Sequence, residues 1–193
     1  MPLSPPSPRQ RLHTRTVRYE GHLREDGLFD IDASLHDVKD RDCVLLSGVR
    51  RAGEPVHDIH VRVTIDLKGV IRAIETHSDA TPYPPYCADH DDAYAALVGT
   101  SLFAGFRKAL YAGMGGVQGC THITELLANL PTAAVQTFAG LQREDSGDHK
   151  PYQLDRCHAL DTHGAAVRRY YPKWHRGPGE DADAPDAKER ETT

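Results

Sequence analysis

Residues 57–74 read HDIHVRVTIDLKGVIRAI, and this stretch decides the fold of the chain. In its first ten residues apolar and polar side chains alternate, which is the pattern of a strand that is buried on one face. Leu67–Gly69 supplies a turn, and the apolar run Val70–Ile74 returns as a second strand. The stretch therefore predicts an antiparallel hairpin with one face turned toward a core.

Outward from this hairpin, the sequence predicts a second hairpin and a long helix. Two extended runs between Thr14 and Val38 flank Arg24–Gly27, and Asp-Gly between such runs is typical of a hairpin turn. Apolar residues spaced by three and four predict a helix over about Thr121–Ala139 with one buried face, which Pro131 would kink or split.

The remaining segments complete an α+β prediction: a mostly antiparallel sheet built from hairpins and packed by two to four helices on one side. We expect helices over 89–98 and 101–112, a polar loop over 142–150 and a last hairpin from 154–160 and 165–171. The expected organisation is a flexible arm over 1–12, a single domain over 13–176 and a disordered tail over 177–193.

The composition and charge of the chain argue against several classes of protein. The chain has 193 residues, a formal charge of −5 and acidic and basic residues that are mixed along its length. The mixture argues against nucleic-acid binding, and no apolar run is long enough to cross a membrane. The Pro- and Ser-rich start, Met1–Arg11, has no apolar segment of a secretory signal, so we expect a cytoplasmic protein whose four cysteines are reduced.

Cys120 is the leading candidate for a functional residue. It stands between a glycine-rich connection and the predicted long helix, in the run Gly119-Cys120-Thr121-His122. Unpaired backbone N–H groups and the helix dipole favour the thiolate there, the form that ligates metals or attacks electrophiles. Glu125 follows on the same side of the helix. Cys120, His122 and Glu125 are thus candidates for metal ligation or catalysis, or else a small helix-start residue, a surface histidine and a helix-stabilising acid.

Further metal-ligand candidates lie in three other segments. Cys87 ends a proline-rich loop, and Cys157 adjoins His158. His57 and Asp58 belong to opposite faces of the predicted strand, and a histidine in line with an apolar face is often a hydrogen-bonded core residue instead. Thiolate and imidazole ligands suit zinc or iron. The sequence contains no closed CxxC zinc motif, P-loop or G-x-S-x-G elbow, so no nucleotide cofactor is expected.

Three functions follow from these candidates. The leading one is a zinc or iron site at Cys120 and His122, with Cys87, Cys157, and His57 or Asp58 as further ligands. An open coordination position would support hydrolase or lyase chemistry on a small organic acid or ester. The second is a metal-free thiol enzyme with Cys120 as nucleophile and a histidine as base. The third is a non-enzymatic metal or sulfur carrier that docks on a partner protein.

Several runs carry a resemblance to a known family: GEPVHD at 53–58, DATPYP at 79–84, GCTHITELL at 119–127, CHAL at 157–160 and YYPKW at 170–174. Together they resemble the bacterial family described as domain of unknown function 2889, over about 12–176. That resemblance implies no established activity.

The order of a hairpin, a loop cysteine, helices and a helix-start cysteine is also similar to NifU-type iron–sulfur scaffold proteins. This second similarity implies that Asp58 or His57 converges with Cys87 and Cys120 on a metal.

Overall fold

The computed structural model describes residues 3–87, 91–139, 141, 150–151 and 153–177. The chain divides into two compact units, Met1–Leu141 and Gln142–Thr193, and each is described by itself. Residues 3–12, where an arm is predicted, have no helix or strand. The predicted loop over 142–150 and the predicted tail over 177–193 lie almost entirely outside the described residues.

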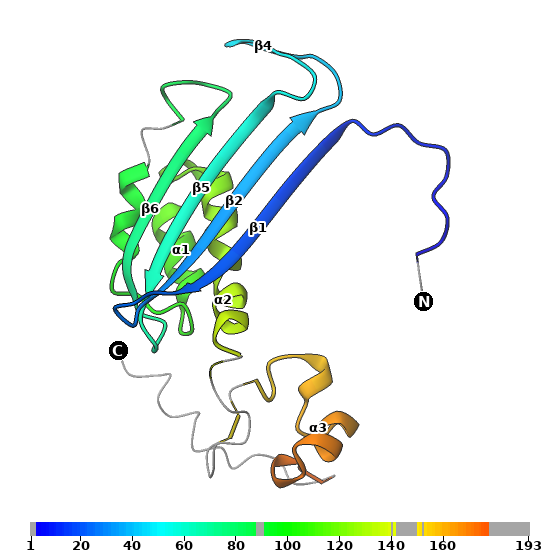
Figure 1. Cartoon of the computed structure of the whole chain (residues 1–193), viewed down its shortest axis with the longest axis vertical. Coiled ribbons are helices and arrows are strands. Elements are labelled where there is room, and N and C mark those ends of the chain that lie inside the picture. The colour runs from blue at the N-terminus through cyan, green and yellow to red at the C-terminus, as the bar shows by residue number, and fades with distance from the viewer. Residues whose placement is uncertain (1–2, 88–90, 140, 142–149, 152, 178–193) are drawn as a thin grey trace. The chain divides into compact units, whose positions relative to one another are not determined.

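The first unit contains a four-stranded antiparallel sheet in the order β1-β2-β5-β6 (Figure 1). Its strands are β1 (His13–Leu23), β2 (Phe29–Lys39), β5 (Pro55–Ile65) and β6 (Ile71–Ala80). Both predicted hairpins are confirmed, because β1 pairs with β2 and β5 pairs with β6. The connection from β2 to β5 carries a small separate hairpin of β3 (Cys43–Leu45) and β4 (Gly48–Arg50).

The turn between β5 and β6 follows directly from its residues. The Asp66 carboxylate accepts hydrogen bonds from the backbone N–H groups of Lys68 and Val70, which closes the turn. Gly69 adopts a φ of +73°, a region that favours glycine, and a Cβ there would lie 2.5 Å from the Phe103 ring.

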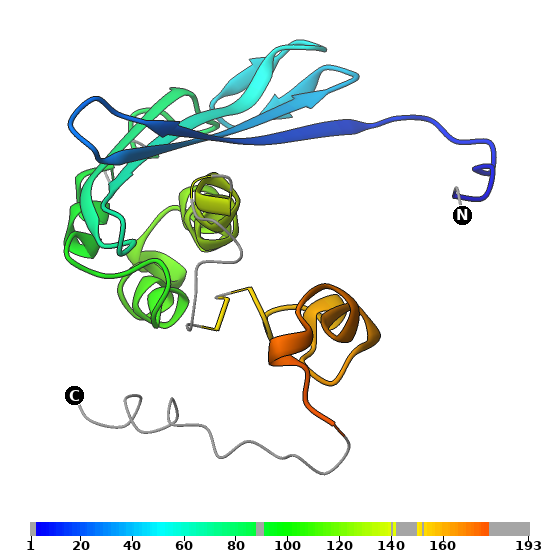
Figure 2. The same ribbon diagram turned by 60° about the horizontal axis from the view of Figure 1, so that its bottom comes forward.

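One face of the sheet carries the core. The alternate residues Ile31, Leu35, Ile59 and Val63 of the two central strands are almost completely buried. Helix α2 (Thr121–Ala139) packs on this face against β1, β2 and β5, while α1 (Phe106–Met114) packs on α2 (Figures 1 and 2). The 3₁₀ helix η1 (Asp91–Leu97) contacts β6. This arrangement confirms the predicted α+β layout.

Helix α2 has the predicted bounds and continues through Pro131 without being split. The two helices expected before it differ from the prediction. The first is the short 3₁₀ helix η1, and the second begins only at Phe106. Ser101 instead forms isolated bridges with Val70 and Gly105, and Gly105 has a φ of +66°, so helical backbone cannot start earlier. A one-turn 3₁₀ helix, η2 (Gly116–Gln118), leads into α2.

The described part of the second unit corrects one prediction. The last hairpin, expected from 154–160 and 165–171, is wrong: the segment forms η3 (His158–Leu160), α3 (Ala165–Tyr170) and η4 (Pro172–Trp174). Asp155 explains the difference, because its carboxylate accepts hydrogen bonds from the backbone and hydroxyl of Thr162 and from Lys150. Burial opposes ionisation, but these bonds lower the pKa of Asp155 to about 2. They close a compact turn where strands would need an extended chain.

In the part of the chain that the structure describes, no helix combines the length and apolar composition needed to cross a membrane.

Candidate functional site

The core face of the sheet ends in a row of polar residues. Arg15 of β1, Asp37 of β2 and His57 of β5 are direct partners across the three strands. Asp37 lies two residues beyond the buried Leu35, so its side chain belongs to the same face, and it is only 3% exposed. A buried carboxylate at the end of an apolar face requires strong hydrogen-bonding partners.

Asp37 receives those partners from three side chains. The Arg15 guanidinium donates to both carboxylate oxygens, from Nε to Oδ1 at 2.9 Å and from Nη2 to Oδ2 at 2.8 Å. His13 Nε2 lies 2.8 Å from Oδ1, and His57 Nδ1 lies 3.1 Å from Oδ2. Burial disfavours the ionised form, but the hydrogen bonds from Arg15 and His13 outweigh it and hold the pKa of Asp37 well below its usual range. Asp37 is therefore a carboxylate.

Two histidines meet beside this carboxylate. The rings of His57 and His122 lie with their centroids 3.9 Å apart and their planes at 36°. Burial lowers the pKa of both rings; the neighbouring His122 adds to the effect on His57, and Arg15 adds to the effect on His122. Asp37, His57 and His122 offer ligand atoms that all lie within 4.8 Å of one another. We call these three residues the inner cluster.

Cys120 and Glu125 lie at the edge of the inner cluster. The Cys120 sulfur is 3.9 Å from Nδ1 of His122. Glu125 accepts a hydrogen bond from Nη1 of Arg15 at 3.1 Å, so the same guanidinium contacts both Asp37 and Glu125. Arg15 thereby joins the N-terminal part of α2 to the start of β1.

A buried tyrosine positions the start of α2. The Tyr94 hydroxyl donates to the carbonyl oxygen of Cys120 at 3.0 Å and lies 3.1 Å from the Thr124 hydroxyl. A Cβ at Gly119 would lie 2.8 Å from that tyrosine oxygen and 2.9 Å from the Met114 carbonyl oxygen. Glycine at this position therefore permits close packing of the chain on itself.

The structure brings together four of the predicted site residues: Cys120, His122, Glu125 and His57. Asp58, the other residue named with His57, points to the opposite face of the sheet, where it pairs with His36 and His60.

Two other cysteines were predicted as metal ligands, Cys87 and Cys157. Cys87 follows the proline-rich loop after β6, and Cys157 is exposed in the second unit. Among the described residues of the first unit, Cys87 belongs to no group of three or more potential metal ligands.

Sequence reasoning missed Asp37, Arg15 and His13. One signal was available, because the alternation of apolar residues along β2 continues to Leu35 and then places an acid on the same face at Asp37. Arg15 and His13 carry no such signal, since their proximity to Asp37 depends on the pairing register of β1 with β2.

A comparison with family models matches residues 13–136 to the family described as "Protein of unknown function (DUF2889)". No curated protein and no solved structure matches the chain. The expected similarity to NifU-type iron–sulfur scaffold proteins is not supported, and the inner cluster contains one carboxylate and two imidazoles. The family match includes the inner cluster, Arg15 and Cys120, and it spans more than half of the chain. The chain therefore belongs to the DUF2889 family.

Proposed function

We propose that the protein binds a zinc or iron ion at the inner cluster, with Asp37, His57 and His122 as ligands and Cys120 as an adjacent fourth donor. The observation that carries this proposal is the convergence of one carboxylate and two imidazoles from β2, β5 and α2 within 4.8 Å. A mixed nitrogen, oxygen and sulfur donor set suits both metals.

The charge states of the three ligands support metal binding. A metal needs deprotonated ligands, and a lowered pKa keeps both imidazoles neutral near pH 7. Asp37 is ionised under the same conditions because of its hydrogen bonds from Arg15 and His13. The inner cluster thus offers a metal one negative charge and two nitrogen lone pairs.

The spacing of the ligand atoms also supports it. Two ligands of a tetrahedral zinc at about 2.1 Å are separated by about 3.4 Å. Oδ2 of Asp37 and Nδ1 of His57 are 3.1 Å apart, so an ion could bind between them with little movement of either strand when the single proton of the neutral His57 ring is on Nε2. Arg15 and His13 would continue to hydrogen-bond the carboxylate and orient it, as residues behind metal ligands commonly do.

An ion held by Asp37, His57 and His122 alone, with Cys120 unbound beside it, would keep a fourth coordination position for water or substrate. Such an ion polarises a carbonyl or activates water, which is the chemistry of a hydrolase or lyase acting on a small organic acid or ester. The Arg15 side chain is 36% exposed beside the inner cluster, so its guanidinium can attract the carboxylate of such a substrate.

One contact favours a second candidate, a metal-free thiol enzyme. Nδ1 of His122 lies 3.9 Å from the sulfur of Cys120, and a neutral imidazole at that position can act as the base for a thiol nucleophile. This function predicts rapid labelling of Cys120 by iodoacetamide near pH 6 in protein free of metal. A carrier function predicts metal binding, or transfer that depends on Cys120, without turnover.

Metal analysis of the full chain, produced without a histidine tag, tests the proposal. We expect His57→Gln and His122→Gln to hold one equivalent of zinc or iron less than the wild type, because each removes a ligand. His22→Gln is the matched control: this exposed histidine lies 3.9 Å from an Asp32 oxygen, away from the inner cluster. Absence of stoichiometric metal from the wild type, with unchanged content in Cys120→Ser, would rule the inner metal site out.

A further inference from the structure

A second group of histidines and acids lies on the outer face of the sheet. In the described part of the first unit, the helices pack on the core face and leave this outer face open (Figures 1 and 2). The group, called here the outer cluster, consists of His36 on β2, Asp58 and His60 on β5, and His77 and Asp79 on β6. Strand register explains the grouping, since His36 pairs with Asp58 and His60 pairs with His77.

His60 occupies the centre of the outer cluster. Its Nε2 lies 3.1 Å from Oδ1 of Asp58 and 3.3 Å from Oδ2 of Asp79. The other oxygen of each acid faces a different imidazole: His36 Nδ1 is 3.4 Å from Oδ2 of Asp58, and His77 Nε2 is 3.0 Å from Oδ1 of Asp79. Each carboxylate is therefore held between the central histidine and one flanking histidine.

The two acids of the outer cluster have a different kind of ion-pair partner from two other acids on this sheet. Asp32 pairs with the Arg62 guanidinium through both oxygens, and Asp37 pairs with Arg15. Among the ion pairs of the described residues, Asp58 and Asp79 have only imidazole partners. Two adjacent carboxylates without arginine or lysine favour a divalent cation at this position.

We propose that Nε2 of His60, Oδ1 of Asp58 and Oδ2 of Asp79 form a second metal site, which binds a divalent transition metal such as zinc. One ligand atom from each of these three residues lies within 4.8 Å of the other two. The separations from Nε2 of His60, 3.1 and 3.3 Å, are close to the spacing of about 3.4 Å between ligands of a tetrahedral zinc. The imidazole ligand favours zinc over magnesium or calcium, which prefer oxygen ligands alone.

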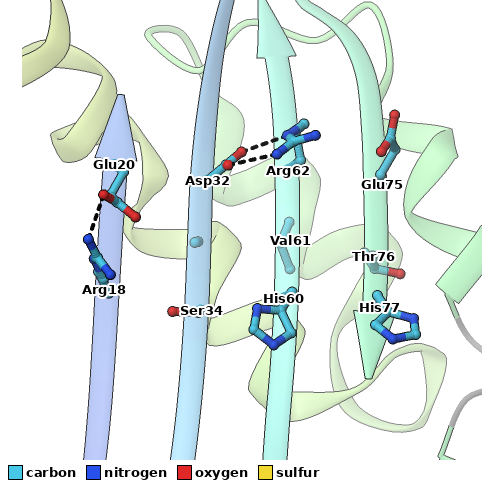
Figure 3. A pocket seen from close by; sticks show the side chains of 11 residues that line it. Arg18, Glu20, Asp32, Ser34, His60, Val61, Arg62, Glu75, Thr76 and His77 are labelled. Atoms are coloured by element: carbon cyan, nitrogen blue, oxygen red, sulfur yellow. Dashed lines mark hydrogen bonds and ion pairs between the residues drawn. The ribbon is translucent and has the colours of Figure 1, made fainter. Parts of the chain in front are cut away.

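The flanking histidines and the shape of the surface also support a metal at this position. His77 hydrogen-bonds Oδ1 of Asp79, and His36 Nδ1 lies 3.4 Å from Oδ2 of Asp58, so both flank the oxygens that the metal would leave free. His60 and His77 also line a depression of about 410 Å³, which extends toward Arg62 (Figure 3). The side chain of His60 is 48% exposed and that of Asp79 is 58% exposed. A metal bound here would therefore keep positions open to water or to a small anion.

Zinc titration of the full chain against a chromophoric chelator tests this site separately from the inner cluster. In the His122→Gln background, we expect one equivalent of zinc to remain bound. Adding His60→Gln should abolish that binding, and Asp79→Asn should weaken it about tenfold or more, as loss of one ligand predicts. His22→Gln is the matched control, since it removes another exposed histidine that lies near an acid and should leave the zinc content unchanged.

Different experimental results would contradict the inner and the outer metal site. If the inner cluster binds no metal, His60→Gln should remove the single equivalent of the wild type and His122→Gln should leave it. The outer site is overturned if the His122→Gln protein binds no zinc with a dissociation constant below about 1 mM. It is also overturned if His60→Gln binds as much zinc as His22→Gln, or if magnesium displaces zinc at equal concentration.

Discussion

Asp37→Asn should cost the first unit a large part of its stability. The substitution keeps the shape of the side chain but replaces one acceptor oxygen by an NH₂ donor and removes the charge. In the folded protein, both oxygens of Asp37 accept hydrogen bonds from Arg15, and His13 and His57 lie within 3.1 Å of them. The new amide would therefore face donors that have lost their acceptor.

The burial of Asp37 and Arg15 sets the loss of stability that we expect from Asp37→Asn. Removing one partner of a fully buried ion pair costs about 3–5 kcal/mol. Asp37 is buried, but the side chain of Arg15 is 36% exposed, and water can solvate part of the guanidinium once the pair is broken. We therefore expect Asp37→Asn to lower the free energy of unfolding by about 2–3 kcal/mol.

Urea unfolding of the full chain near pH 7, with EDTA present, measures this cost. Asp32→Asn is the control, because Asp32 makes a similar two-bond pair with Arg62 but on the exposed face, where about 1 kcal/mol or less is expected. Equal costs for the two variants would refute the reasoning.

The dependence on pH gives a second check. Asp37 has a pKa below its usual 3.8 in the folded state, so its stabilisation is complete above pH 3.8 and is lost as the pH falls through the folded value. Asp37 also raises the pKa of His57 and His122 against the effect of burial, so the difference between wild type and Asp37→Asn should widen as these rings protonate below pH 6.5. It should narrow only below pH 3.8, where Asp37 itself begins to take up a proton. A difference that narrows already above pH 3.8 would contradict the assignment of Asp37 as a stabilised carboxylate.

Two further predictions concern α2. Gly21→Ala should destabilise the first unit by about 1–3 kcal/mol, because the new Cβ would lie 1.9 Å from Oγ1 of Thr137. Adding Thr137→Ala should recover most of that loss in thermal unfolding, and an unchanged loss would exclude this contact as the cause. The pKa of His122 is lowered from 6.5 by burial and by Arg15, so the unfolded chain binds the proton more tightly and acidification below pH 6.5 favours unfolding. His122→Gln in EDTA should lose less stability than the wild type between about pH 7.5 and about pH 5.5, and an identical loss would contradict the prediction.

Local sequence patterns predicted much of the architecture, because a strand or a helix is specified largely by residues that are close together in the chain. Alternation over residues 57–66 specified a half-buried strand, and the three- and four-residue spacing over 121–139 specified the bounds of α2. The prediction of a last hairpin was wrong because hydrogen bonds from Thr162 to the side chain of Asp155 override the weak strand pattern. A pattern of apolar residues does not indicate where side-chain hydrogen bonds will favour a turn over a strand.

The sequence by itself determined the two long hairpins, helix α2 and the proximity of Cys120 to His122, which are only two residues apart. Only the tertiary structure decided which other residues join them. The register of three strands places Arg15, Asp37 and His57 in one row, and the packing of α2 on that face brings His122 onto His57. The same register separates Asp58 from His57, since adjacent residues of a strand point to opposite faces. Long-range pairing therefore defines both clusters, because it joins residues that no local spacing connects.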